Sequence, residues 1–370
     1  MGRGELFPRP CSVRGRARPA HHGGDMRAVA VFAMLLVVLG GSSLGLPGVA
    51  CAADKPLVVC LLEGTLGDKG PNDALKDALA QVERELPVRV KLVASAYADT
   101  LDQAFTDALA DRDKPPLLLM AAGAGPHTLL MNYAGNYRTQ LFAAFDGYIP
   151  FANIASLLFY EAQGAYLAGV AAAVGADEAA RRGKPGGVAC LTDRDSWANT
   201  TMGKAFALGA GSVDATLSVS SSHSGSTSDD AAARTAADRA LSTGAASLFI
   251  ASGKAGLAAL TTVERAGGFA VGYGQDQATI APRAVLCSYR KNMLLAVRTC
   301  VQKALDGSLK GRDFLSMTVE NGGVDMPLNP KLPPELHARL EAALAAARER
   351  LHAGVPDLPP AHPPKGCNCR

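Results

Sequence analysis

The chain has 370 residues, of which 48% are hydrophobic and 19% are charged, and its formal net charge is +3. These values are typical of a globular chain with room for two domains. The sequence has no basic stripe with interleaved aromatic residues, so nucleic acid is not an expected partner.

Residues 1–53 are expected to be a signal peptide with an N-terminal extension. Met26 and an arginine precede an apolar segment that is shorter than the roughly 20 residues of a membrane-spanning helix. Residues 1–25 are either a long basic leader or an upstream start that leaves Met26 as the initiator. Gly48-Val-Ala-Cys51 resembles a lipoprotein cleavage box, although glycine stands where leucine is usual. Lipidation of Cys51 and plain secretion therefore both stay open, and export is expected in either case.

From Leu57 onward, short apolar segments that are typical of buried parallel strands alternate with segments of helical spacing. Strands are expected over 57–62, 88–93, 117–121 and 141–145, and helices near 71–86, 100–109 and 127–133. With right-handed crossovers this order predicts a parallel sheet. The segment 153–159 then leads into an Ala/Gly-rich helix over 161–174.

A second series of the same kind begins after a Gly/Pro/Lys break at 181–187. Its strands are expected over 188–191, 215–219, 247–251 and 269–273, and its helices near 200–209, 229–241 and 257–266. Two similar α/β halves suggest two lobes with a cleft between them. The Ser-rich segment 218–228 is expected to be a surface loop that could also border the cleft. A strand at 284–288, helices over 291–305 and 336–351, and a disordered tail over 356–370 complete the prediction.

Three acidic residues follow predicted strands or lie in the loops after them: Asp68, Asp146 and Asp276. In open α/β sheets, ligands bind at this carboxyl edge of the strands. A carboxylate accepts two hydrogen bonds at once, which suits a vicinal diol or a ring N–H and disfavours a phosphate. Each acid alone is more often a cap or turn residue, and it is their common position at the sheet edge that favours a binding site.

Lys291 and Trp197 are further candidates at that edge. Lys291 follows the strand that begins near residue 284, and it either reaches the cleft or is a solvated lysine at a helix start. Trp197 is the single tryptophan and lies in a loop after a strand, where an indole either stacks on a planar ligand or covers the core.

The sequence shows no catalytic constellation, so we expect neither an enzyme nor a cofactor. The histidines lack metal-ligand spacing, and no Gly-x-Ser-x-Gly elbow stands between a strand and a helix. Cys60, Cys190 and Cys287 lie in apolar strand-like segments and are expected to be small buried thiols. The role of the Cys367-Asn-Cys369 tail stays open between metal binding, disulfides and an unstructured end.

Several motifs resemble those of the basic membrane protein (BMP) family, the substrate-binding proteins of bacterial ABC transporters, which typically bind purine nucleosides. Gly67-Asp-Lys-Gly-Pro-Asn72 is similar to the Asp-Lys-Ser-Phe-Asn signature after the first strand of that family. Asn153–Ala173 resembles its "Asn-Val-Ala-Ser … Glu-x-x-Gly-x-x-x-Gly-x-x-Ala" segment. Further similar blocks follow in the order of the family at Val271–Gln277, Val285–Lys291 and Leu305–Gly311. The similar region runs from about Leu57 to Leu351.

The resemblance implies a type I periplasmic-binding-protein fold, in which two Rossmann-like α/β lobes are joined by a hinge of crossing strands. The lobes are then expected over 55–158 plus 288–315 and over 159–287 plus 316–355. By the same resemblance, Asp68 and Asn72 hold the ligand from the first lobe and Asp146 bonds its base. Asp276 takes ribose hydroxyls, Gly253 lets the backbone approach, and Lys291 completes the polar clamp near the hinge.

The sequence also departs from the family pattern. Gly70-Pro71 replaces Ser-Phe, Gly274 replaces the first acid of Asp-x-Asp-Gln, and Met202 stands where the family has a base-stacking phenylalanine. Aromatic stacking is therefore weakened unless Trp197 supplies it, and the purine specificity of the family does not follow directly.

The expected protein is an exported, monomeric receptor that binds a nucleoside-like small molecule and presents it to an ABC transporter permease. It would be periplasmic or anchored by lipid to the outer side of the cell membrane. Two alternatives stay open: a sensory ligand-binding protein for a membrane receptor, and a nucleoside-cleaving enzyme, which would need a base or metal cluster that the sequence lacks.

Overall fold

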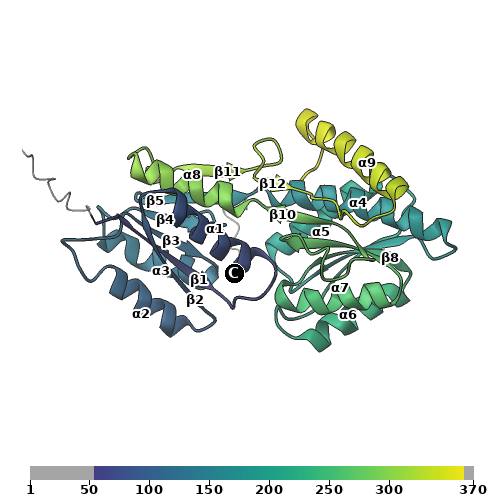
Figure 1. The fold of residues 1–370 in the computed structure, drawn as a ribbon, viewed down its shortest axis with the longest axis horizontal. Coiled ribbons are helices and arrows are strands. Elements are labelled where there is room, and N and C mark those ends of the chain that lie inside the picture. The colour runs from purple at the N-terminus through teal and green to yellow at the C-terminus, as the bar shows by residue number, and fades with distance from the viewer. Residues whose placement is uncertain (1–53, 362–370) are drawn as a thin grey trace, which may run out of the picture. The chain divides into compact units, whose positions relative to one another are not determined.

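The computed structural model describes residues 54–361, which form two six-stranded sheets flanked by helices (Figure 1). The expected signal peptide, Cys51, and the Cys367/Cys369 end of the tail lie outside the described residues. Within the described part, no helix is long and apolar enough to cross a membrane.

The first sheet has the strand order β11-β5-β4-β3-β1-β2, and all of its neighbouring strands pair in parallel. Its strands are β1 (Leu57–Glu63), β2 (Arg89–Ser95), β3 (Leu118–Ala122), β4 (Phe142–Phe145), β5 (Ile154–Phe159) and β11 (Phe314–Met317). The helices in contact with it or next to it in sequence are α1 (Pro71–Glu85), α2 (Ala98–Ala108), α3 (Ala124–Tyr133), the 3-10 turn η1 (Ala134–Asn136) and α8 (Met293–Leu305).

Strand β1 is covered on both faces, as its continuous apolar sequence predicts. Val58 and Cys60 belong to the core cluster that contains α1 and α8, whereas Val59 and Leu61 belong to the cluster that contains α2 and β4. Residues on opposite faces of a strand alternate, so a buried central strand has to be apolar at every position.

The second sheet has the order β12-β10-β9-β8-β6-β7, in which only the short β12 pairs antiparallel among the described strands. Its strands are β6 (Gly187–Thr192), β7 (Val219–His223), β8 (Ala245–Ala251), β9 (Phe269–Gly274), β10 (Val285–Lys291) and β12 (Val324–Asp325). Its helices are α4 (Glu161–Arg181), α5 (Trp197–Gly211), α6 (Asp230–Ser242), the 3-10 turn η2 (Gly253–Ala255), α7 (Gly256–Arg265) and α9 (Pro334–Ala353). Alternating strands and helices in two mostly parallel sheets confirm the predicted α/β class.

Two elements differ from the expectation. The strand expected over 215–219 is β7, which begins at Val219 and includes serines that the sequence assigned to a loop. Serine is tolerated there because β7 is an edge strand whose side chains are largely exposed. Strand β10 extends to Lys291 in the second sheet, so the expected change of lobe between 287 and 288 falls inside this strand.

The predicted burial of Cys60, Cys190 and Cys287 is confirmed, and Cys300 is buried as well. Burial raises the pKa of each of these thiols to about 12, so they remain protonated at neutral pH.

Helices α4 and α5 pack at unusually close range because glycines face the opposing backbone. A Cβ atom added at Gly169 would lie 2.0 Å from the carbonyl oxygen of Phe206, and one added at Gly209 would lie 1.9 Å from that of Tyr166. Neither position can hold a larger residue unless the helices separate.

The close packing predicts a large difference between two glycine substitutions on α5. Gly209→Ala should lower the free energy of unfolding by about 2 kcal/mol or more, because the methyl group overpacks the helix contact. Gly211→Ala is the matched control: its Cβ meets nothing within 4 Å, so it should be neutral or stabilise by up to about 1 kcal/mol. Urea unfolding measures both, and equal effects would contradict the close contact.

Candidate ligand-binding site

The carboxylate of Asp68 is turned into the beginning of α1. Its Oδ1 accepts the backbone N–H groups of Gly70 (2.9 Å) and Asp73 (3.1 Å), and its Oδ2 accepts that of Asn72 (3.1 Å). Asp68 is only 5% exposed. In this structure Asp68 therefore acts as a helix cap, the ordinary role of such a residue, and its contact with a ligand stays a prediction.

Glu63 plays the same part at the neighbouring helix. It is the last residue of β1, and its Oε2 accepts the backbone N–H of Gly125 at 2.8 Å, in the first turn of α3. Gly123 makes room for it, since a Cβ there would lie 2.5 Å from the Cβ of Glu63. Two helix N-termini at this sheet edge thus already hold a carboxylate of the protein, where a phosphate would otherwise be favoured.

The side chain of Asn72 lies next to the same glycine-rich loop. Its amide nitrogen donates to the carbonyl oxygen of Thr65 at 3.1 Å, and it would contact a Cβ placed at Gly64. Asn72 is partly exposed, so it closes the loop between β1 and α1 and also reaches its surface.

Asp146 and Lys291 form an ion pair that joins elements of the two sheets. The ammonium nitrogen of Lys291, the last residue of β10, lies 2.6 Å from Oδ2 of Asp146, which follows β4. Only 2% of the Lys291 side chain is exposed, against 32% of the Asp146 side chain. The sequence predicted both residues for the site, and the structure brings them into direct contact.

Asp146 is held in an unusual backbone conformation, with φ at 59°. The ring of His127 lies against the following residue: its Cε1 would be 2.2 Å from a Cβ at Gly147, and its Nε2 bridges the carbonyl oxygens of Ala121 (3.0 Å) and Phe145 (3.2 Å). Burial lowers the pKa of His127, which favours the neutral ring. The Asp-Gly turn is therefore fixed by its surroundings.

Glu161, the first residue of α4, is the second carboxylate of the Lys291 ammonium. The hydroxyl of Tyr273, in β9, donates to Oε1 of Glu161 at 3.0 Å. The ammonium also lies 5.4 Å from the ring centres of Phe159 and Tyr273. One buried cation is thus surrounded by two acids and two aromatic rings.

The electrostatics of this cluster follow from its burial. Burial alone would lower the pKa of Lys291, but the charges of Asp146 and Glu161 outweigh it and raise the pKa well above its ordinary value. Burial raises the pKa of Glu161, and the nearby Lys291 only partly offsets that rise. Lys291 is therefore charged, whereas Glu161 takes up a proton more readily than an exposed glutamate.

The loop that carries Asp68 touches the loop that carries Asp276. The amide of Gln277 donates to the carbonyl oxygen of Lys69 at 3.0 Å, and a Cβ at Gly274 would lie 2.4 Å from Cδ of Pro71. Asp276 is exposed, and its Oδ1 accepts the backbone N–H of Ala278 at 3.0 Å. Asp276 and Lys291 both line a cavity of about 390 Å³ between α1 and the ends of β9 and β10.

The remaining predicted residues lie on α5 and after β8. Trp197 is the first residue of α5 and is partly exposed, whereas Met202 is 4% exposed and belongs to the main core cluster. Gly253 has φ at 58°, and a Cβ there would lie 3.0 Å from Cβ of Thr227. The structure does not unite these three residues with Lys291 through any described contact, and their role as ligand contacts stays a prediction.

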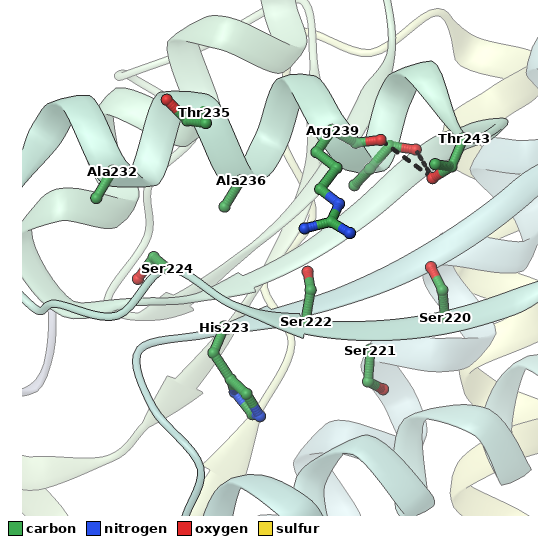
Figure 2. Close-up of a pocket in the computed structure, with 11 residues that line it drawn as sticks. Ser220, Ser221, Ser222, His223, Ser224, Ala232, Thr235, Ala236, Arg239 and Thr243 are labelled. Atoms are coloured by element: carbon green, nitrogen blue, oxygen red, sulfur yellow. Dashed lines mark hydrogen bonds between the residues drawn. The ribbon is translucent and has the colours of Figure 1, made fainter.

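A larger groove of about 630 Å³ lies away from the predicted residues, between β7 and α6 (Figure 2). Figure 2 shows the hydroxyls of Ser220 and Ser222 on the strand and the Arg239 side chain reaching toward them from the helix. None of the acids near Lys291 lines it. Within residues 54–361 no group of His, Cys, Asp and Glu side chains could hold a metal ion.

Sequence reasoning missed Glu161, Tyr273 and Glu63 as members of the candidate site. Glu161 carried a detectable signal, because it is a lone charged residue at the start of an Ala/Gly-rich helix that follows a buried strand. Tyr273 offered no comparable signal, since an aromatic residue in a strand is ordinarily a core residue.

The comparison with protein families agrees with the resemblance seen in the sequence motifs. The family model described as "Bmp: ABC transporter substrate-binding protein PnrA-like" matches residues 55–346, which confirms the resemblance drawn from the motifs. No curated protein matches the sequence.

Solved structures share the fold at low sequence identity. An ABC transporter solute-binding protein from Aeropyrum pernix K1 has a TM-score of 0.67 at 19% identity, over 81% of this chain and 91% of that one. One from Conexibacter woesei DSM 14684 has a TM-score of 0.64 at 19% identity, over 82% and 98%. A periplasmic solute-binding protein from Actinobacillus succinogenes 130z with bound D-allose has a TM-score of 0.57 at 12% identity, over 78% and 100%.

The ion pairs of Lys291 predict a strong effect of removing the cation. Lys291→Met should lower the free energy of unfolding by about 3–5 kcal/mol, because Asp146 and Glu161 would be left without their counter-charge. The neighbouring Arg290→Met is the control: Arg290 pairs with Asp325 at the surface, 2.7 Å away, and its loss should cost less than about 1 kcal/mol. Chemical unfolding at neutral pH compares the two, and a small effect of Lys291→Met would count against a structural charge cluster.

Proposed function

The chain belongs to the Bmp family of PnrA-like ABC transporter substrate-binding proteins, and from that premise we propose that it binds a nucleoside-like small molecule between its two lobes. Substrate-binding proteins of this class act outside the cytoplasm, and they deliver a ligand to a transporter rather than transform it. We also propose that the residues described above bind this ligand and that the chain is exported, with or without a lipid on Cys51.

The observation that carries the proposal is the Lys291 cluster. It stands at the carboxyl ends of strands from both sheets, where ligands bind in open α/β folds. Asp146 keeps about a third of its side chain exposed while its partner is buried, so the cluster presents a carboxylate to the solvent side. A carboxylate that is fixed by a buried ammonium is suited to accept hydrogen bonds from a base N–H or a ribose hydroxyl.

The charge pattern favours an uncharged ligand over a nucleotide. The carboxylates of Asp68 and Glu63 accept backbone N–H groups at the N-termini of α1 and α3, so fewer of these donors remain for a phosphate. Asp276 adds another negative charge near the cavity beside Lys291. A phosphate placed among these acids would be repelled, whereas hydroxyl groups would find acceptors.

Trp197 is the residue we propose to cover a planar base, because it is a partly exposed aromatic at the start of α5, after β6. Met202 of the same helix is buried in the core and offers less surface to a ligand.

The proposal predicts a preference for nucleosides over their 5′-monophosphates. Isothermal titration with adenosine, guanosine, inosine, cytidine and uridine should show binding of at least one of them. The matching monophosphate should bind about tenfold more weakly or worse, a loss of at least about 1.4 kcal/mol. Free ribose and D-allose serve as sugar controls. Binding of the sugars alone, or of monophosphates more tightly than nucleosides, would refute the nucleoside assignment.

Asp276 gives a separate prediction. Asp276→Ala should weaken nucleoside binding by about 2 kcal/mol or more, because a ribose diol would lose a charged acceptor. The control is Asp214→Ala, since Asp214 is exposed and its carboxylate bonds only Thr216 among the described residues. Titration of both variants with the preferred nucleoside decides the point, and an unchanged affinity of Asp276→Ala would remove this residue from the site.

A further inference from the structure

The chain passes between the two sheets at three junctions in the described residues: at Tyr160 between β5 and α4, at Asn292 between β10 and α8, and over 318–323 between β11 and β12. The junctions are tied to one another by backbone hydrogen bonds. The N–H of Tyr160 donates to the carbonyl of Met317 at 2.8 Å, and that of Asn292 donates to the carbonyl of Gly323 at 2.9 Å. These segments must bend if the two sheets move relative to each other.

Glu161 and Lys291 stand directly beside two of these junctions. Glu161 follows Tyr160 and Lys291 precedes Asn292, and their side chains form an ion pair. That pair joins the first junction to the second, and Lys291 extends the connection to Asp146 in the first sheet. The polar cluster is therefore part of the connection between the lobes as well as part of the candidate site.

Glu161 also has an unused hydrogen-bonding atom. Its Oε1 receives both the Lys291 ammonium and the Tyr273 hydroxyl, whereas its Oε2 is buried and has no partner among the described residues. A buried carboxylate oxygen without a partner costs free energy, so an alternative such as leucine or alanine would be favoured if Glu161 served packing alone.

The ammonium of Lys291 carries three N–H donors, and Asp146 and Glu161 take two of them. The direction of the third donor is set by the other two. If Glu161 were absent, the ammonium would lose one of its two carboxylate partners, and its orientation against Asp146 would be less restricted.

We infer that Glu161 is a positioning residue for ligand recognition: it fixes the Lys291 ammonium against Asp146, so that this pair keeps the orientation a ligand requires. The inference rests on the proposed function, because the ligand it concerns is the one that Asp146 would bind. The charged and titratable groups that face Glu161 are Lys291 and Tyr289 of β10, Tyr273 of β9 and Asp146 after β4.

A charge on Glu161 is needed for this role, which gives a pH signature. Because burial raises the pKa of Glu161 above its ordinary value of 4.5, the group becomes neutral on acidification before an exposed glutamate does. Nucleoside affinity should therefore fall as the pH is lowered from 7 toward 5. Glu161→Gln keeps the shape and an acceptor for Tyr273 but carries no charge, so it should bind at least about fivefold more weakly at pH 7 and lose this pH dependence.

Titration with the preferred nucleoside at pH 7, 6 and 5 compares the wild type with Glu161→Gln and with Glu178→Gln. Glu178 lies on the same helix and pairs with Arg182 and Arg339 at the surface, so its variant should behave as the wild type. Wild-type affinity and pH dependence in Glu161→Gln would overturn the inference while leaving the proposed function intact.

A second measurement needs no ligand, so it distinguishes a failure of the Glu161 inference from a failure of the proposed nucleoside binding. Urea unfolding of Glu161→Gln, Asp146→Asn and the double variant forms a double-mutant cycle, in which two residues that share one ammonium should not act independently. Each single variant changes the unfolding equilibrium constant by some factor. The factor for the double variant should differ from the product of the two single factors by about fivefold or more. Independent effects would overturn the placement of Lys291 between the two acids, whether or not a nucleoside binds.

Discussion

The structure depends on one constraint, which is that a buried ammonium has to be neutralised. Lys291 is 3% exposed, and an isolated charge at such a position would cost several kcal/mol. The charge is offset by carboxylates from two different parts of the chain, Asp146 after β4 and Glu161 at the start of α4. Because these parts belong to different sheets, the need to pair one cation fixes how the first sheet meets the second at this place.

The positions of the other carboxylates indicate which ligands suit the sheet edges. Parallel strands followed by helices usually leave free N–H groups at the helix N-termini, and these groups attract anions. Here the chain supplies its own anions: Asp68 closes α1, and Glu63 closes α3. Asp146 and Asp276 are both exposed in part and add hydrogen-bond acceptors at this edge. The edge that could have bound a phosphate is thereby suited to hydroxyl and N–H groups.

Much of this arrangement could be predicted from the sequence, because it rests on local patterns. Apolar strands covered on both faces and helices of regular spacing identified the α/β order, and the acids after the strands identified Asp146 as a candidate. The partner of Lys291 at the start of α4 was not predictable, because a contact between Glu161 and a residue 130 positions later in the sequence depends on how two sheets meet. The prediction of a loop at the serines of β7 was wrong for another reason. An edge strand with exposed side chains needs few apolar residues, so its composition resembles that of a loop.

The role of Asp68 could not be decided from its residue type and position in the sequence. A carboxylate after a strand is equally suited to a ligand hydroxyl and to the N–H groups of the next helix, and the glycines around it decide between them. Gly70 places its N–H 2.9 Å from Oδ1 of Asp68, which draws the side chain inward. No pattern of residue types specifies that geometry, since it depends on backbone angles that glycine leaves open.

Pro71 and Gly274, two positions at which the sequence departs from the pattern of the family it resembles, lie in contact in the structure. Their segments come from different sheets, and a side chain at position 274 would begin 2.4 Å from Cδ of Pro71 and 2.9 Å from the carbonyl carbon of Gly70. Gly274 also has φ at 93°, a conformation that is strained for an aspartate. An acid at 274 is thus excluded by the proline ring and by the backbone together, so Gly274 is compatible with Pro71 whereas an aspartate there is not. Asp276, two residues further along the same loop, then remains the acid through which this loop could hold a hydroxyl-bearing ligand.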